Sequence, residues 1–250
     1  MFRSMKELVG YAIDAVDGEI GKVHDFYFDD QAWSVRYLVI DTGGWLSSRK
    51  VLVAPLALGM PKWESKALPV RLTKEQVEKS PSTDLDRPVS RQMEEELYTH
   101  YGWKPYWGGA RGRAAARVIE KSMANDAESS GDLNLRSANE LIGYHIQASD
   151  GEIGHTTDFI VDDEAWVIRY LMVDTGGWLP GKRVLVSPSW AESVTWPERN
   201  IYVGIPREMV KNSPEFDPSA PVNREYELRL YDYYGRPRYW TAVGSERSPQ

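Results

Sequence analysis

Cysteine is absent from this sequence of 250 residues. Its absence excludes disulfides, thiolate metal ligands, iron–sulfur clusters and cysteine nucleophiles. Long apolar runs are absent too, since the longest, such as residues 51–58, fall far short of the roughly 20 residues that span a membrane. The first residues also lack the apolar core of a signal peptide. We therefore expect a cytoplasmic protein with no transmembrane segment, and peripheral association with a membrane stays open.

Basic residues are too few for an extended phosphate-binding surface. Lys and Arg number 30 against 37 Asp and Glu, a net charge of −7, so nucleic-acid binding is not expected. Histidine occurs only four times, and the sequence has no H-E-x-x-H, G-x-S-x-G or Walker pattern. We expect neither an enzyme nor a bound cofactor or metal. The hydrophobic fraction of 42% and aromatic fraction of 12% do predict a folded globular chain.

The chain contains one sequence twice. Shifted by 133 residues, it aligns residues 3–107 with 136–240 without a gap, and 49 of the 105 positions are identical. The period is much longer than a solenoid repeat, which indicates a duplicated domain. We expect four parts: repeat 1 (1–107), a partly helical linker (108–135), repeat 2 (136–240) and a flexible C-terminus (241–250). The charge is uneven, −2 in residues 1–107 and −6 in residues 140–250.

Each repeat has the pattern of a small β domain followed by two helices. Short runs rich in β-branched and aromatic residues alternate with Gly and Asp turns, and no crossover helix fits between them. Ser90 and Asn223 are candidate N-caps of helices 91–101 and 224–234, which Gly102 and Gly235 end. The predicted fold is mainly β with short helices: two tandem small β-barrels that form an internal pseudo-dimer.

Three segments recur in the same order in both repeats: D-G-E-I-G at 17–21, W-x-x-R-Y-L at 33–38 and D-T-G-G-W-L at 41–46. Together they resemble the PRC-barrel domain, named for the cytoplasmic domain of the photosynthetic reaction-centre H subunit. The resemblance covers about residues 4–55 and 137–188. It implies a protein-docking module, since one such domain helps to seal the reaction centre and gate its protons, and another forms the C-terminal part of a small-subunit ribosome maturation factor. No catalytic residues are known for the domain, so the resemblance assigns none here. We expect a bacterial protein.

The recurring carboxylates are interpreted as turn residues. Asp17-Gly18 and Asp150-Gly151 are tight-turn signals. Arginines also recur inside apolar strands, and a buried arginine needs a charged partner. We expect Arg36 either to point to solvent or to pair with one of two aspartates, and its counterpart in repeat 2 likewise. The candidate ion pairs are Arg36 with Asp25 or Asp41, and Arg169 with Asp158 or Asp174.

Ten tryptophans are more than a core of this size requires. Two of them follow Gly-Gly turns, where a ring can project from a hairpin tip or fold back on its barrel. The candidate protein-interaction residues are Trp45 with Gly43 and Gly44, and Trp178 with Gly176 and Gly177.

The sequence thus predicts a non-enzymatic docking or adaptor protein with protein partners, either a monomer with an internal pseudo-two-fold axis or a homo-oligomer. Three alternatives remain: a ribosome- or RNA-associated factor, a peripheral component of a photosynthetic or electron-transfer complex, and a metal- or small-ligand-binding protein that uses the repeated carboxylates.

Overall fold

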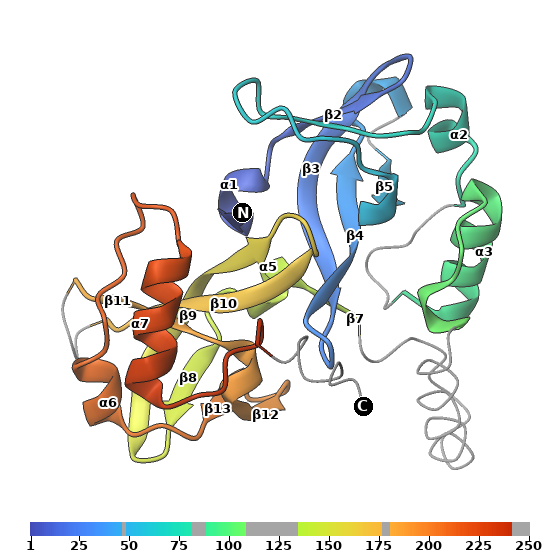
Figure 1. The fold of residues 1–250 in the computed structure, drawn as a ribbon. Coiled ribbons are helices and arrows are strands. Elements are labelled where there is room, and N and C mark those ends of the chain that lie inside the picture. The colour runs from blue at the N-terminus through green and yellow to red at the C-terminus, as the bar shows by residue number, and fades with distance from the viewer. Residues whose placement is uncertain (47–48, 82–88, 109–134, 177–180, 242–250) are drawn as a thin grey trace, which may run out of the picture. The chain divides into compact units, whose positions relative to one another are not determined.

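The computed structural model describes residues 1–46, 49–81, 89–108, 135–176 and 181–241 (Figure 1). The predicted linker helix and the last nine residues lie outside these ranges. The chain divides into two compact units: residues 1–7 with 140–250, here called unit 1, and residues 8–139, here called unit 2. Both are mainly β with short helices, which confirms the predicted fold class.

Unit 2 is built around two long antiparallel strands, β3 (Gly18–Asp29) and β4 (Ser34–Asp41) (Figure 1). Both carry the aromatic and β-branched residues that favour a half-buried sheet. Four shorter strands pair with the long ones or with each other: β2 (Ala12–Ala15) and β7 (Leu135–Ser137) with β3, β5 (Lys50–Val53) with β4, and β6 (Ala67–Pro69) in parallel with β2.

Two helices follow these strands, as the sequence predicted. Helix α2 (Lys74–Glu78) begins at Thr73 with a capping box, and α3 (Arg91–Tyr101) begins at Ser90 and ends at Gly102 in the left-handed conformation. The remaining helical segments of this repeat are a single turn or less: α1 (Met5–Leu8), η1 (Gly43–Leu46), η2 (Pro55–Ala57) and η3 (Tyr106–Gly108).

Unit 1 repeats this plan. Its long pair is β9 (Gly151–Asp162) and β10 (Val167–Asp174), and its last helix, α7 (Arg224–Tyr234), runs from Asn223 to Gly235. The other elements are β1 (Phe2–Ser4), α5 (Ala138–Leu141), β8 (His145–Ala148), β11 (Arg183–Val186), η4 (Pro188–Trp190), β12 (Ala191–Thr195), β13 (Asn200–Val203) and α6 (Arg207–Lys211).

One strand has no full counterpart. In unit 1, β12 forms a regular antiparallel ladder with β13. In unit 2 the aligned segment makes only the isolated bridges Leu58–Val70 and Lys62–Ala67. Strand β6, the partner of β2 in unit 2, is correspondingly short.

Glycine is required where the first hairpin of each unit meets the end of the second long strand, β4 or β10. Gly21 has φ +145°, and a Cβ there would collide with the carbonyl oxygen of Asp41. Gly154 approaches Asp174 in the same way at φ +158°. This close approach explains why the last glycine of D-G-E-I-G is present in both repeats.

The units exchange their leading strands. Strand β1, which starts repeat 1, pairs with β9 in unit 1, whereas β7, which starts repeat 2, pairs with β3 in unit 2. The registers are equivalent, with Ser4 opposite Ile160 and Ser137 opposite Tyr27. Each unit therefore combines one repeat with the first strand of the other.

Candidate functional site

A buried glutamate joins the last helix of unit 2 to its sheet. Glu94 on α3 is fully buried, and its Oε1 accepts hydrogen bonds from Tyr37 Oη on β4 (2.7 Å) and Tyr106 Oη (2.9 Å). Arg91 Nη1 donates to Glu94 Oε2 at 2.6 Å. Burial and the adjacent Glu94 charge raise the pKa of Tyr37 far above its ordinary value. The phenol therefore remains a proton donor to the carboxylate, and the cluster fastens α3 to β4.

Unit 1 contains the same cluster. Glu227 on α7 is fully buried and accepts from Tyr170 Oη (2.7 Å) and Tyr239 Oη (2.9 Å), and Arg224 Nη1 lies 2.8 Å from its Oε2. Sequence analysis missed this cluster. The available signal was that all four residue types are identical in the two repeats, although a glutamate near a helix start also has an ordinary solvent-exposed interpretation.

The predicted partners of the strand arginines are wrong. Arg36 Nη2 donates to Asp29 Oδ2 at 2.8 Å, not to Asp25 or Asp41, and its guanidinium lies 4.0 Å from the ring centroid of Tyr106. Asp29 lies opposite Ser34, next to the bulge in which Arg36 is the extra residue of β4. Asp25 lies opposite Val39 and Asp41 is five residues along the strand, so both are farther along the ladder from Arg36 than Asp29 is.

Unit 1 gives the same correction. Arg169 Nη2 bonds Asp162 Oδ2 at 3.4 Å and stacks on Tyr239 at 4.0 Å, instead of pairing with Asp158 or Asp174. Both arginine side chains are about one-fifth exposed and each bonds an aspartate, so neither simply points to solvent.

The carboxylates at the turns accept hydrogen bonds from backbone N–H groups. Asp17 Oδ1 accepts from Lys74 N at the start of α2 (2.8 Å), and Asp150 Oδ1 accepts from Arg207 N at the start of α6 (2.7 Å). The glycines that follow them, Gly18 and Gly151, have φ of +133° and +139°. Asp41 Oδ1 accepts from Gly43 N and Asp174 Oδ1 from Gly176 N. Within the described ranges, no three acidic or histidine side chains come together as a candidate metal site.

Asp25 and Asp158 have a different role, because they accept hydrogen bonds from the residues at the ends of the exchanged strands β7 and β1. Asp25 is 7% exposed and accepts from Ser137 Oγ (2.5 Å) and Asn139 N (3.2 Å). Asp158 is 6% exposed and accepts from Ser4 Oγ (2.5 Å) and Lys6 N (3.0 Å). Burial raises the pKa of both carboxyl groups, and these hydrogen bonds oppose that rise.

Trp45 is both attached to its unit and partly exposed. Its Nε1 donates to the carbonyl of Ile20 at 2.7 Å, and 38% of the residue is exposed. Lys74 Nζ lies 5.5 Å from the ring centroid, and Lys74 N is bonded to Asp17, the neighbour of Val16. Trp178 and Gly177 lie outside the described residues.

The same part of unit 2 exposes three aliphatic side chains: Val16 (69%), Leu56 (46%) and Met60 (87%). Val16 N donates to Leu72 O, Arg71 Nη2 donates to Leu56 O, and Gly59 N donates to Pro69 O. All three residues thus border the segment 67–72. We call Val16, Leu56 and Met60 the apolar edge.

Repeat 2 has serine at all three aligned positions. Ser149, Ser189 and Ser193 are exposed, as their apolar counterparts are. The adjoining segment differs in charge as well: residues 56–72 carry +2, from three basic groups and one acidic group, and residues 189–205 carry −1. In this part of the fold the two copies therefore differ in exposed side chains, in charge and in strand β12, which has no full counterpart in unit 2.

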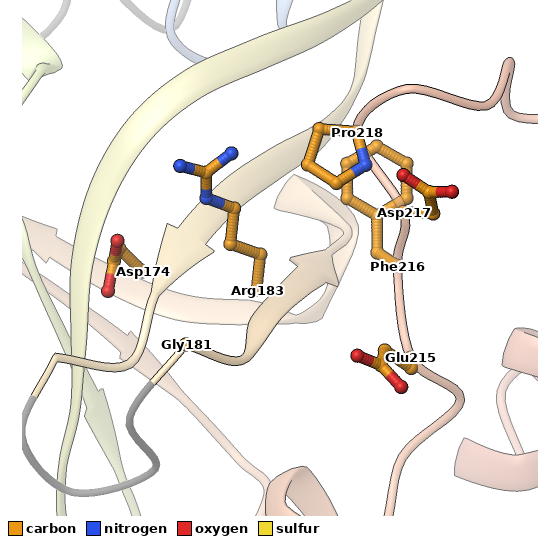
Figure 2. A pocket seen from close by; sticks show the side chains of 7 residues that line it. All are labelled: Asp174, Gly181, Arg183, Glu215, Phe216, Asp217 and Pro218. Carbon is orange, nitrogen blue, oxygen red and sulfur yellow. The ribbon is translucent and has the colours of Figure 1, made fainter.

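Unit 1 also has an open hollow of about 590 Å³ (Figure 2). Asp174, Gly181 and Arg183 border it from the ends of β10 and β11, and Phe216 and Pro218 come from the segment between α6 and α7, with Glu215 and Asp217 beside them. One arginine among three carboxylates leaves the lining net negative. In repeat 1 the aligned positions of the second segment lie outside the described residues.

Comparison with known proteins agrees with this architecture. The model of the PRC-barrel domain family matches residues 3–74 and 134–210, more than half of the chain, so this chain belongs to the PRC-barrel domain family and contains the domain twice. An uncharacterized protein of Deinococcus radiodurans is 36% identical over 91 residues. That match spans 36% of this chain and 32% of the other protein. Among the described residues, no helix has the length and apolar character needed to cross a membrane.

Proposed function

We propose that this protein is a non-enzymatic docking protein that binds a protein partner through the apolar edge of unit 2. One observation carries the proposal: Val16, Leu56 and Met60 are exposed where the duplicate has serine. Unit 1 folds with three hydroxyls at the aligned positions, so the domain does not require apolar side chains there. Exposed apolar residues gathered along one edge are typical of an interaction surface.

The charge beside this edge indicates the chemistry of the partner. Lys66 and Arg71 are exposed within the segment that carries +2. We therefore expect the partner to present an apolar surface bordered by carboxylates, whose encounter with unit 2 is faster at low salt. Trp45 is partly exposed, and Lys74, which lies near its ring, is bonded to Asp17 beside Val16, so we include Trp45 in the proposed surface.

A site-directed photo-crosslink tests the proposal in the source cells. A photoreactive residue replaces Met60 in one full-length variant and the aligned Ser193 in a matched control. We expect a partner that crosslinks at position 60 and not at position 193. Equal crosslinking at the two positions, or none at position 60, would contradict the proposal.

The crosslinked partner is then purified and titrated against three forms of the chain: the natural sequence, the triple variant Val16→Ser, Leu56→Ser and Met60→Ser, and a control with alanine at 149, 189 and 193. Burying one such side chain is worth about 1.5–3 kcal/mol. We expect the serine variant to bind at least tenfold more weakly and the control to bind as the natural chain does. Unchanged binding by the serine variant would place the docking surface elsewhere.

A further inference from the structure

Both units hold the exchanged strand by a shared set of contacts, to which unit 1 adds an ion pair of the Met1 amino group with Asp163 Oδ1 at 2.6 Å. In unit 1, Ser4 Oγ and Lys6 N donate to Asp158, while Arg3 Nε donates to Asp163 Oδ2 at 3.3 Å. In unit 2 the equivalent donors are Ser137 Oγ and Asn139 N to Asp25, and Arg136 Nε to Asp30 Oδ2 at 3.1 Å. The leading strands themselves read Phe-Arg-Ser and Leu-Arg-Ser.

The receiving aspartate depends on the strand for its hydrogen bonds. Asp158 accepts from the neighbouring Phe159 N at 2.7 Å, and Ser4 and Lys6 supply two further donors. A carboxylate that is 6% exposed needs such donors, because burial without partners is costly. The β-ladder contributes the affinity of an added strand, and the serine and arginine contacts select the sequence.

We propose that the edge of β9 that pairs with β1, together with Asp158 and Asp163, is a binding site for an extended apolar–Arg–Ser segment, and that it also accepts this segment from a second copy of the chain. Within one chain, β1 already fills this site. Strand β1 belongs to repeat 1, whereas β9, which forms the site, belongs to repeat 2. Cis occupancy is favoured by an effective concentration in the millimolar range. Exchange between two copies preserves the contacts of the strand with β9, Asp158 and Asp163. It becomes dominant once a chain can no longer fill its site with its own strand.

A complementation experiment on the full-length chain tests this proposal. Ser4→Asp places a carboxylate against Asp158, which leaves the site intact but disables the strand. Asp158→Ala leaves the strand intact but disables the site. Each variant alone should sediment as one chain, and an equimolar mixture at about 100 μM, well below the effective cis concentration, should form a complex of twice that mass. The control mixture pairs Ser4→Asp with Asp17→Ala, whose own strand and site are both intact, and should form no complex.

A peptide arm decides the outcome if Asp158→Ala fails to fold. A peptide of residues 1–8 with a free amino terminus and a label at its carboxyl end should bind the Ser4→Asp chain saturably, and at least tenfold more weakly if its serine is alanine. The natural chain, whose site is occupied, should bind it at least tenfold more weakly than the Ser4→Asp chain does. If the folded Ser4→Asp chain, checked by circular dichroism, binds neither the peptide nor the Asp158→Ala chain, the proposal is wrong.

Discussion

Unit 1 and unit 2 fasten their last helices in the same way, with a buried glutamate between two tyrosines and an arginine, yet they differ along one edge, where Leu56 and Met60 face the solvent in unit 2 and serines do so in unit 1. Contacts that hold the fold are retained in both copies. Exposed positions that the fold does not constrain have diverged in polarity and charge. Comparison of the two copies thus distinguishes the residues that stabilise the domain from the exposed residues that can change without loss of the fold and so can bind a partner.

The largest expected effect concerns the shared cluster. Removing one member of a buried charge pair typically costs 3–5 kcal/mol, and the partners Arg91 and Arg224 are 39% and 51% exposed, which lets water compensate in part. We expect Glu94→Ala and Glu227→Ala each to lower the free energy of unfolding by about 3 kcal/mol, measured by urea denaturation. The exposed Glu95→Ala on the same helix is the control and should cost less than about 0.5 kcal/mol. Clearly unequal effects at positions 94 and 227 would show that the two clusters are not equivalent.

The pH dependence of stability sharpens the comparison of the two strand-receiving aspartates. Burial raises the pKa of Asp25 and Asp158 above the ordinary value of 3.8. The folded chain therefore binds protons more readily than the unfolded chain, and these groups add stability as the pH falls through the folded pKa toward 3.8. Each unit of such a rise corresponds to about 1.4 kcal/mol.

Asp25→Asn and Asp158→Asn should abolish this gain equally. The measurement is the denaturation midpoint of each variant relative to the natural chain between about pH 7 and pH 4. The natural chain should gain stability over either variant as the pH falls, and Asp17→Asn controls for the loss of one surface carboxylate. A gain that instead appears as the pH rises would reverse the assigned direction of the shift.

A smaller effect is expected at the strand arginines. Arg36 and Arg169 each combine an aspartate contact with stacking on a tyrosine, and a lysine cannot reproduce the planar guanidinium. We expect each Arg→Lys substitution to cost about 1 kcal/mol, and Arg36→Lys slightly more, because its contact with Asp29 is 2.8 Å against 3.4 Å for Arg169 and Asp162. Urea denaturation of the two variants side by side checks both the size and the order. An equal or larger loss from Arg71→Lys, an exposed arginine, would show that stacking contributes nothing.

Much of the framework could be predicted because its signals are local. The cap at Ser90 and the stop at Gly102 depend on neighbouring residues, and the structure has both: Ser90 accepts from Met93 N, and Gly102 is left-handed. Long-range partners could not be derived in this way. Tyr37 and Glu94 are 57 residues apart, and nothing in either segment specifies their contact.

The partner of Arg36 was missed for a related reason. Irregular register between Val23 and Asp25 and between Tyr27 and Phe28 determines which aspartates share its face, and a sequence read by simple alternation does not locate such bulges. The strand exchange has a further cause. Because Arg3-Ser4 and Arg136-Ser137 are the same, the sequence is equally compatible with either strand in either unit.

The smallest expected effect on stability is the one most informative about function. The variant with serine at positions 16, 56 and 60 changes only exposed side chains, so its free energy of unfolding should stay within about 0.5 kcal/mol per position of the natural value. The reciprocal variant, with Val, Leu and Met at 149, 189 and 193, should be equally stable. If instead the serine variant loses several kcal/mol in urea denaturation, these side chains pack within the chain and their exposure has no bearing on a partner. If it keeps its stability and loses the partner, the divergence between the copies is a divergence in what they bind.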